Sequence, residues 1–299
     1  MVSFVDGPVT VTVPATSANL GPGFDSLGLA LSMRDRLSAS VAPAGLDVIV
    51  EGAGADEVPR DERHLVVRAM RAAFSAMDAA PPGLVLRCTN VIPHSRGLGS
   101  SSAAIVAGLA LARGLVAGGS LVLDDDALFR MAADLEGHPD NVAPALFGGF
   151  TISGREDGEF FTVRAAVDPR VATVVFVPPT PVATEVARGL LPAVVPHAEA
   201  AANSGRTALL VAALGGRPEL LLAATRDHLH QSYRAPAMPG SLDLVGTLRA
   251  DGVPAVVSGA GPTVLAFADA ASVEVLLARC PDGWTAHHLA VEPRGVALA

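Results

Sequence analysis

The chain has 299 residues, half of them hydrophobic, and it carries a formal net charge of −9 with a pI of about 5.3. This composition predicts a globular protein with one large domain or two medium ones, and it excludes a largely disordered chain. A protein that grips a phosphate backbone needs a basic face. The acidic balance and the lack of any basic run therefore argue against a nucleic-acid partner.

Every one of the 21 Lys+Arg residues is an arginine. The missing lysine excludes the nucleotide hydrolases that use a Gly-Lys-Ser/Thr loop, the protein kinases with their strand lysine, and the pyridoxal enzymes with their Schiff-base lysine.

Cys88 and Cys280 stand in apolar stretches and predict buried free thiols in a reducing compartment. The first residues lack the basic and long apolar regions of a secretory signal. The uncharged stretch 97–112 opens with glycine and serine and is closed by Arg113, so we expect a buried helix there and not a membrane span. We expect a cytoplasmic protein with no membrane partner.

In the first half of the chain, valine alternation predicts an initial strand, and alanine and leucine at helical spacing predict a helix over 61–77. Asp124–Asp126 supply the N-cap signal of a later helix, and Gly137 ends it. The predicted order is strands over 11–20, 34–42, 46–52 and 84–92 with the helix 61–77 before the last of them, helices over 101–116 and 127–137, a loop with a short helix over 138–150, and a hairpin over 151–167.

In the second half the alternation of strands and helices starts again, which predicts an α/β or α+β protein. We place the boundary between 160 and 170 and predict domains over 1–165 and 166–299. The predicted elements are a strand over 171–179, helices over 184–191, 202–214 and 219–231, a strand–turn–strand unit over 254–268, a helix over 272–280 and a strand over 284–295.

The segment PHSRGLGSSSAA, residues 93–104, follows a predicted strand and opens a helix. Such a loop directs backbone N–H groups and the positive helix end at an anion, and Gly97 and Gly99 allow a close backbone approach. Without lysine, the charge of a nucleotide must be met by these amides, a divalent cation and Arg96. The dinucleotide-binding fingerprint is not met, because its third glycine is missing. A tight turn with a serine N-cap is the structural alternative.

The segment DLEGHPDNVAP offers oxygen ligands for a cation. Glu136 closes a helix, and His138, Asp140 and Asn141 crowd the loop that follows. Magnesium favours one or two protein carboxylates, so Glu136 suffices, whereas zinc lacks a set of spaced cysteine or histidine ligands. His138 beside a carboxylate is typical of a hydrogen-bonding residue. His228 and His230 lie two apart on a predicted helix, and His287 and His288 lie on a predicted strand, so neither pair shares a face.

The segment PATSANLGPGFDSLG gathers Thr16, Ser17, Asn19 and Asp25 among glycines, a pattern that favours a site where a ligand meets backbone. The turn SGAGPT at 258–263 repeats this pattern. Two arginines, Arg188 and Arg234, stand beside polar loops. A surface salt bridge is the simple interpretation of each, and together they could clamp a carboxylate.

The segments PATSANLGPGFD, PHSRGLGSSSAA, LEGHPDNVAP and SGAGPT occur in this order along nearly the whole chain. Together they resemble the GHMP kinase superfamily, and the first segment with HPDN is most similar to the homoserine kinases. The resemblance implies a two-domain α+β fold, with an N-terminal domain like ribosomal protein S5 domain 2 and a ferredoxin-like C-terminal domain. It also implies ATP and Mg²⁺ as cofactors.

The resemblance further implies roles for individual residues. The cation would be held by Ser101 and Glu136, and Asn141, Asp140 and Arg188 would be catalytic, with the identity of any base left open. The homoserine pocket would comprise Asn19, Asp25, His138, Thr184, Arg188, Arg234 and Gly261. The ATP-binding residues would be Pro93, His94, Ser95, Arg96, Gly97, Leu98, Gly99, Ser100, Ser101, Ser102, Ala103 and His64, the last standing where relatives usually carry asparagine.

The function implied is ATP-dependent phosphorylation of the homoserine side-chain hydroxyl in threonine biosynthesis. Since the transferred group needs positioning and charge neutralisation above all, we expect those to dominate the mechanism. The alternatives are a mevalonate- or sugar-type GHMP kinase and a nucleotide-binding sensor without catalysis. A serine hydrolase is a weaker alternative, because no G-x-S-x-G elbow occurs. The sequence leaves the oligomeric state open, with a homodimer as the candidate.

Overall fold

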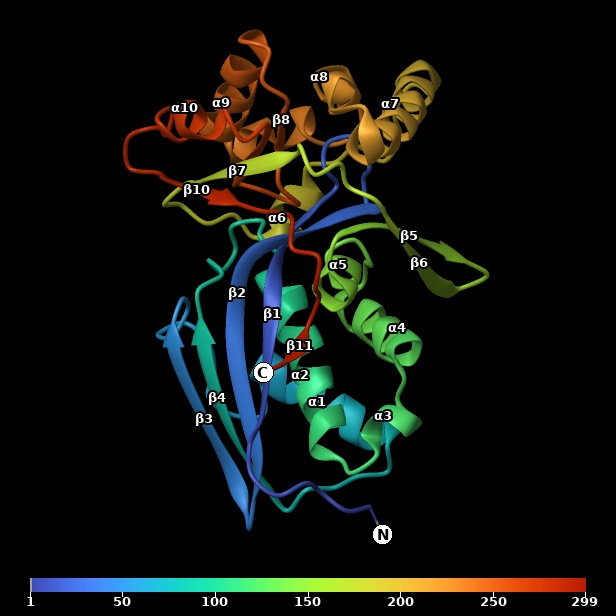
Figure 1. Cartoon of the computed structure of the whole chain (residues 1–299), viewed down its shortest axis with the longest axis vertical. Coiled ribbons are helices and arrows are strands. Elements are labelled where there is room, and N and C mark those ends of the chain that lie inside the picture. The colour runs from blue at the N-terminus through green and yellow to red at the C-terminus, as the bar shows by residue number, and fades with distance from the viewer. Residues whose placement is uncertain (1) are drawn as a thin grey trace.

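The strands of residues 2–299, which the computed structural model describes, form two separate sheets. Figure 1 shows the larger sheet upright in the lower part of the molecule and the smaller one lying across the upper part. The first half of the chain supplies most of the larger sheet, and the second half supplies the smaller one. This arrangement is the α+β architecture that the family resemblance implies.

The elements follow one another in this order: β1 (Val9–Ala18), β2 (Leu27–Ala42), β3 (Gly45–Gly52), α1 (Leu65–Ala76), β4 (Gly83–Asn90), α2 (Ser100–Leu115), α3 (Gly119–Val122), α4 (Asp125–Glu136), α5 (Val142–Phe147), β5 (Phe150–Glu156), β6 (Glu159–Ala165), β7 (Ala172–Val177), α6 (Thr184–Gly189), α7 (His197–Gly216), η1 (Pro218–Leu220), α8 (Leu221–Ala224), η2 (Ser232–Ala237), α9 (Pro239–Ala250), β8 (Ala255–Val257), β9 (Val264–Ala268), α10 (Val273–Leu277), β10 (Thr285–Leu289) and β11 (Ala297–Leu298).

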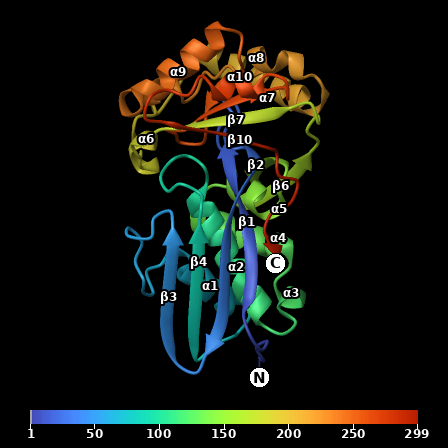
Figure 2. The ribbon, with the colours of Figure 1, turned by 60° about the vertical axis from the view of Figure 1, so that its left-hand side comes forward.

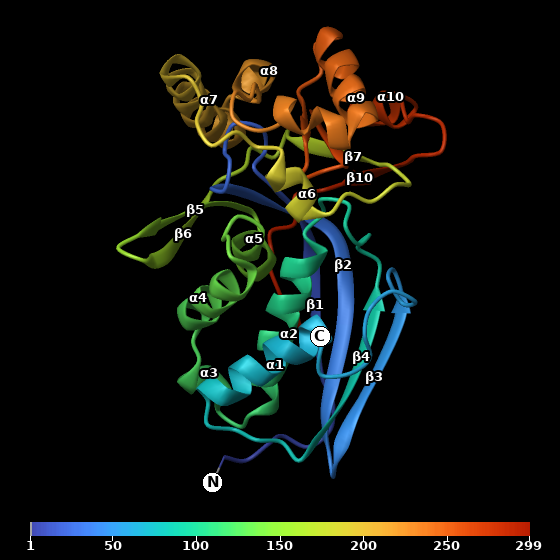
Figure 3. The same cartoon turned by 180° about the vertical axis from the view of Figure 1, so that it is seen from behind.

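The larger sheet has the order β11-β1-β2-β4-β3, and the hairpin of β5 and β6 joins it through β2. Strands β3 and β4 run parallel with α1 as their crossover, and the other pairs are antiparallel. Figures 2 and 3 show α1 and α2 packed along one face of this sheet. Helix α2 is buried on nearly all sides, as its apolar sequence predicts, because the sheet, α1, α4 and α5 surround it.

The smaller sheet has the antiparallel order β10-β7-β9-β8 and buries both faces. Because side chains alternate along a strand, Val175 and Leu265 face the core of the larger sheet. Val174 and Val264 face the opposite way, into a second core with α9 and α10. One hydrophobic core thus runs across the junction between the two parts, and the residues at that junction are held in place by both.

The predicted helix over 219–231 is wrong beyond Ala224. The Asp227 side chain accepts hydrogen bonds from the backbone N–H groups of Leu229, His230 and Gln231. A carboxylate that bonds its own downstream backbone competes with helical hydrogen bonding, so the chain turns here. The helix predicted from Asp61 also begins later, at Leu65, because residues before it form a turn.

Strand β11 returns the end of the chain to the larger sheet, where Leu298 pairs with Val11. The segment 166–299 therefore contributes to both sheets, and the two domain ranges remain a prediction. Cys88 is buried as expected, and burial raises the pKa of its thiol to about 12, whereas Cys280 is partly exposed. Among residues 2–299, no helix has the length and apolar character that crossing a membrane requires.

Candidate active site

Two adjoining cavities share the lining residues Ser95, Ser100 and Ser101; residues from both parts of the molecule line the first, and residues 35–104 of the first part line the second. The first, named here the polar cavity, holds about 130 Å³, and the second, the mixed cavity, about 250 Å³. The polar cavity is lined by Asn19, Ser95, Gly97, Gly99, Ser100, Ser101, Glu136, His138, Asp140, Asn141, Thr184, Arg188, Arg234, Gly259 and Ala260. The mixed cavity is lined by Asp35, Leu37, Val58, Pro59, Arg63, His64, Leu65, Val66, Cys88, Asn90, His94, Ser95, Ser100, Ser101 and Ala104.

The glycine–serine loop separates the two cavities and ends at the N-terminus of α2. Gly97 and Gly99 both have positive φ, of 74° and 70°. A side chain on Gly97 would collide with the Ser258 carbonyl, and one on Gly99 with the Thr16 hydroxyl. These glycines therefore let the loop pack tightly against β1 and the 258–263 turn, which leaves the first amides of α2 at the boundary of the cavities.

Arg96 directs its guanidinium at the backbone. It donates hydrogen bonds to three backbone carbonyl oxygens: from Nη1 to His94 at 3.0 Å, from Nε to Pro178 at 3.0 Å and from Nη2 to Pro179 at 2.5 Å. Its predicted role in neutralising the charge of phosphate stays a prediction. Arg96 ties the loop to the segment that leads into α6.

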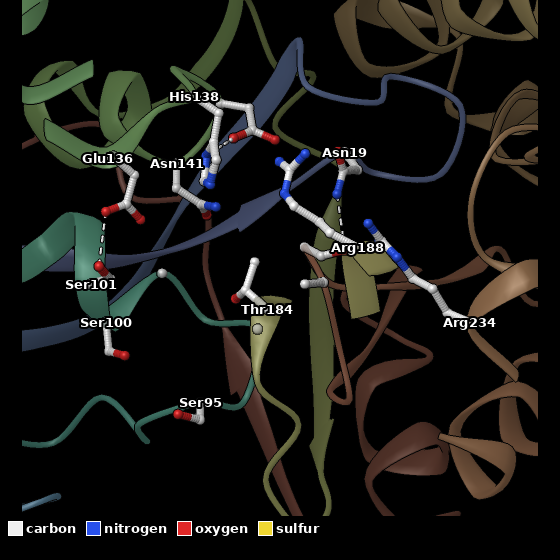
Figure 4. Close-up of a pocket in the computed structure, with 15 residues that line it drawn as sticks. Asn19, Ser95, Ser100, Ser101, Glu136, His138, Asn141, Thr184, Arg188 and Arg234 are labelled. Carbon is white, nitrogen blue, oxygen red and sulfur yellow. Dashed lines mark hydrogen bonds and ion pairs between the residues drawn. The ribbon is translucent and has the colours of Figure 1, made fainter. Parts of the chain in front are cut away.

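Glu136 connects the end of α4 to the start of α2. Its two carboxylate oxygens accept hydrogen bonds from the Ser101 and Ser102 hydroxyls, at 2.8 and 2.9 Å. Figure 4 shows Glu136 and Ser101 facing each other at one edge of the polar cavity. One carboxylate and a neighbouring hydroxyl form a hard oxygen donor set, which suits Mg²⁺.

Two side chains from the loop before α5 are oriented by buried partners. The Asn141 amide oxygen accepts a hydrogen bond from the Thr16 hydroxyl at 2.8 Å, which leaves the amide N–H₂ group free to donate. His138 Nδ1 lies 3.0 Å from a carboxylate oxygen of Asp140, which is only 2% exposed. Burial lowers the pKa of His138, but the hydrogen bond and charge of Asp140, with Glu136, outweigh it and raise the pKa above its ordinary value.

The loop after β1 holds a strained conformation at the cavity wall. Asn19 and Asp25 have positive φ, of 66° and 53°, a region that L-residues rarely occupy. The Asn19 side chain stabilises it by accepting from the Asp25 backbone N–H at 2.9 Å and donating to the Gly259 carbonyl at 2.9 Å. Asp25 thereby reaches α6, where its carboxylate forms a two-point ion pair with Arg188.

Arg234 is a buried cation with no acidic partner. Its side chain is 1% exposed, and among residues 2–299 no carboxylate lies within ion-pair distance of it. Its Nε is buried without any hydrogen-bond partner in that part of the chain. Burial first, and then the charge of Arg188, lower its pKa to about 10. Because a buried unpaired charge is costly, this geometry indicates a site for an anionic ligand group.

The mixed cavity has an apolar wall with a few polar groups. His64 is 5% exposed, and its Nδ1 has no partner among the described residues. Burial lowers the pKa of His64, so a neutral imidazole is favoured. Asp35 receives the backbone N–H groups of Val91 and Ile92 on one carboxylate oxygen, at 2.6 and 2.9 Å, and so fixes the entry to the glycine–serine loop.

Comparison with known proteins assigns the chain to a family. Residues 64–149 match the family described as "GHMP kinases N terminal domain", and residues 209–285 match "GHMP kinases C terminal". A homoserine kinase of Streptomyces avermitilis is 55% identical over 296 residues, with 99% of this chain and 97% of the relative covered. The chain belongs to the homoserine kinase family.

A homoserine kinase of Streptomyces coelicolor is 54% identical, with 99% of this chain and 96% of the relative covered. The fold agrees with the crystal structure of the homoserine kinase from Cytophaga hutchinsonii, which has a TM-score of 0.86 at 24% identity and covers 98% of this chain and 97% of that one. The fold of a homoserine kinase that the sequence motifs imply is thus confirmed.

Most of the site residues that the resemblance implies for a homoserine kinase lie together. Asn19, His138, Asp140, Asn141, Thr184, Arg188 and Arg234 line the polar cavity. Asp25 and Gly261 do not line it: Asp25 is joined to it through its ion pair with Arg188, and the 258–263 turn contributes Gly259 and Ala260 instead. His64 and His94 line the mixed cavity. Pro93, Arg96, Leu98, Ser102 and Ala103 line neither, and the Leu98 and Ala103 side chains belong to the core.

Sequence reasoning missed three partners of these residues. Thr16 orients Asn141, Ser258 bonds the Gly97 carbonyl and the Ser17 hydroxyl, and His230 contacts Arg234. The i, i+4 spacing of His230 and Arg234 was the available signal for the last contact. No sequence pattern connects Thr16 to Asn141, which lies 125 residues away.

Proposed function

We propose that this chain transfers the γ-phosphate of ATP to the side-chain hydroxyl of L-homoserine, giving O-phospho-L-homoserine and ADP in threonine biosynthesis. The relatives that carry the name homoserine kinase, at 54–55% identity over nearly the full length, support this activity. The observation that carries the choice of acceptor is Arg234, a buried cation that faces a polar cavity and has no acidic partner among residues 2–299.

The polar cavity has the charges that an amino-acid zwitterion needs. In the proposed complex, the homoserine carboxylate binds Arg234, and its ammonium group binds the Asp25 carboxylate and the neighbouring amide of Asn19. Arg188 pairs with Asp25 through bonds of 2.6 and 3.2 Å, and its positive charge then offsets the negative charge of the carboxylates around it. Thr184 supplies a hydroxyl at the exposed edge of the cavity.

The mixed cavity fits the base of ATP, and the shared serines lead the triphosphate towards the polar cavity. Its apolar wall suits an aromatic ring, and the unpartnered His64 Nδ1 can receive a hydrogen bond from it. The backbone amides at the start of α2 compensate the phosphate charge together with the positive end of the helix. This loop therefore needs no lysine.

Magnesium fits the oxygen donors of Glu136 and Ser101. The two groups already lie 2.8 Å apart at the loop. A bound Mg²⁺ would supply positive charge at the phosphate oxygens, as is general in phosphoryl transfer. The Glu136 carboxylate would then bind the ion in place of the Ser101 and Ser102 hydroxyls.

For the transfer itself, His138 is the proposed proton acceptor. With Nδ1–H donating to Asp140, the lone pair of Nε2 is free on the other side of the ring, and Figure 4 shows His138 beside Asn141 at the polar cavity. The homoserine hydroxyl gives its proton to His138 as its oxygen forms the new O–P bond, and the bond between phosphorus and the bridging oxygen of ADP breaks. Asn141 and Arg188 donate to the phosphoryl oxygens.

The direct test is ADP release by the purified chain with ATP and Mg²⁺, in parallel on L-homoserine, L-threonine, mevalonate and galactose. Turnover with homoserine alone supports the proposal. Turnover with mevalonate or galactose would instead support another type of GHMP kinase. ATP binding without turnover of any of the four would support the nucleotide-binding sensor.

The homodimer and the cytoplasmic location expected from the sequence remain predictions. Light scattering of the purified chain tests the first, and fractionation of cells that express it tests the second.

A further inference from the structure

His230 occupies a buried position between the loop after β1 and the guanidinium of Arg234. Its side chain has no exposed surface. Nε2 lies 2.7 Å from the Gly21 carbonyl oxygen, and Nδ1 lies 2.9 Å from Nη1 of Arg234. The Arg234 Nη1 also donates to the Gly259 carbonyl at 3.0 Å, the same oxygen that receives the Asn19 amide.

These two contacts permit a single form of the imidazole. A guanidinium has only donors, so Nδ1 must accept from Arg234. A carbonyl oxygen only accepts, so Nε2 must carry the hydrogen that is donated to Gly21. His230 is therefore neutral, in the Nε2–H tautomer, and a second proton on Nδ1 would place two cations 2.9 Å apart.

The groups that face His230 agree with this form. The Phe24 ring lies 5.2 Å from the imidazole centroid and also lies against Arg234, at 5.7 Å from its guanidinium carbon. A carboxylate oxygen of Asp227 lies 3.7 Å from Nε2, on the donating side of the ring. Asp25 and Arg234 are the other charged groups that act on it, and burial lowers the pKa of His230.

We propose that His230 is a positioning residue, which holds the Arg234 guanidinium in the orientation that receives the substrate carboxylate and couples it to the Gly21 carbonyl of the loop after β1. The proposal rests on the proposed function for the identity of that carboxylate. Without the Nδ1 acceptor, Arg234 keeps its bond to Gly259 but loses the contact that fixes its rotation about that bond. Carboxylate binding then weakens, while the transfer step, which Arg234 does not contact, continues.

Two variants separate the two contacts of the ring. In His230→Asn, the amide oxygen stands near the position of Nδ1 and can accept from Arg234, but the contact with Gly21 is lost. In His230→Gln, the longer side chain brings its amide N–H₂ group near the position of Nε2 and can donate to Gly21, but the acceptor for Arg234 is lost. Each variant is thus the matched control of the other.

We expect His230→Gln to raise the KM for homoserine about tenfold or more, with kcat and the KM for ATP within about twofold of the wild type, since one hydrogen bond to a charged group is lost. His230→Asn should keep the KM for homoserine within about threefold. Equal KM increases in the two variants, or a loss confined to kcat, would overturn the proposal. A wild-type chain that does not use homoserine would count against the proposed function instead.

Nitrogen NMR of the wild-type chain labelled with ¹⁵N-histidine gives a test that needs neither turnover nor a folded His230 variant. The resonances of His230, assigned through the spectral change in Arg234→Met, should show a protonated Nε2 and an unprotonated, hydrogen-bonded Nδ1 near neutral pH. A protonated Nδ1, or a ring that exchanges between tautomers, would contradict the contact on which the proposal depends.

Discussion

Arg188 of α6, which lines the polar cavity, pairs with Asp25 of the loop after β1, with Nη2–Oδ1 and Nη1–Oδ2 distances of 2.6 and 3.2 Å. This ion pair joins residues that lie 163 positions apart and sets the charge pattern of the cavity. Both side chains remain partly exposed, at 35% and 37%, so the pair contributes more to arranging the site than to stability.

Asp25→Asn removes the negative charge that we propose as the partner of the homoserine ammonium group, while it keeps the size of the side chain. We expect the KM for homoserine to rise about tenfold or more, with a KM for ATP within about twofold of the wild type. Steady-state kinetics with each substrate varied in turn measures this. Asp282→Asn, at an exposed position of the second part, is the control and should change neither constant. An unchanged KM for homoserine in Asp25→Asn would exclude Asp25 as the ammonium partner.

Arg234→Met keeps the volume of a long side chain but removes the buried cation that we propose as the partner of the substrate carboxylate. Homoserine should no longer raise the melting temperature of this variant, whereas ATP with Mg²⁺ should raise it as in the wild type. Differential scanning fluorimetry measures both shifts. Arg249→Met is the control, because Arg249 is half-buried and bonds Thr225, Ala255 and Leu222, none of which lines the cavity, and it should keep the homoserine shift. If homoserine still stabilises Arg234→Met, the carboxylate binds elsewhere.

Thr16→Val removes the hydroxyl that fixes the amide of Asn141 without changing the shape of a fully buried side chain. The freed amide can turn its oxygen towards the phosphate, so we expect kcat to fall about tenfold with little change in either KM. Thr10→Val on the same strand, half-buried and far from the loop, should leave kcat unchanged. A drop in melting temperature with unchanged kcat would show that Thr16 only supports the fold.

Asp140→Asn removes the charge that raises the pKa of His138, so this pKa should fall. Because His138 must be unprotonated to accept a proton, the acid limb of kcat should move to lower pH, although kcat itself falls. The pair of His138 and Asp140 also contributes to the free energy of unfolding, and this contribution is larger at low pH than at high pH. It is fully present below the ordinary histidine pKa of about 6.5 and is lost as the pH rises through the raised pKa of the folded protein. Wild type and variant should therefore converge in melting temperature at alkaline pH. An acid limb that does not move would exclude His138 as the proton acceptor.

Glu136→Gln keeps an oxygen that can accept from Ser101 but removes the charge proposed to hold Mg²⁺. We expect the Mg²⁺ concentration for half-maximal activity to rise about tenfold or more, with recovery of part of the activity at high Mg²⁺. Titration of Mg²⁺ at fixed MgATP measures this. The neighbouring exposed Asp134→Asn should leave the requirement unchanged. Equal Mg²⁺ requirements in wild type and Glu136→Gln would place the ion on other residues.

Local features of the site could be predicted from the sequence because they depend on neighbouring residues. The burial of α2 follows from its apolar composition, and the bounds of α4 follow from the Asp124 cap and Gly137. The prediction of a helix over 219–231 was wrong beyond Ala224, because the periodicity of apolar residues does not reveal that the Asp227 side chain accepts hydrogen bonds from the backbone that follows it.

The sequence by itself determined the fold class, the family and the loop between the cavities, because glycine, serine and capping residues act over a few positions. Only the tertiary structure decided what the charged side chains do. It turned Arg96 towards backbone carbonyls, paired Arg188 with Asp25, and left Arg234 buried beside His230, with no carboxylate of the described residues in ion-pair distance. The interaction energy of a charged side chain depends on its burial and on partners that lie more than a hundred residues away in the sequence. Burial and partners are fixed only when both parts of the chain pack on a shared core.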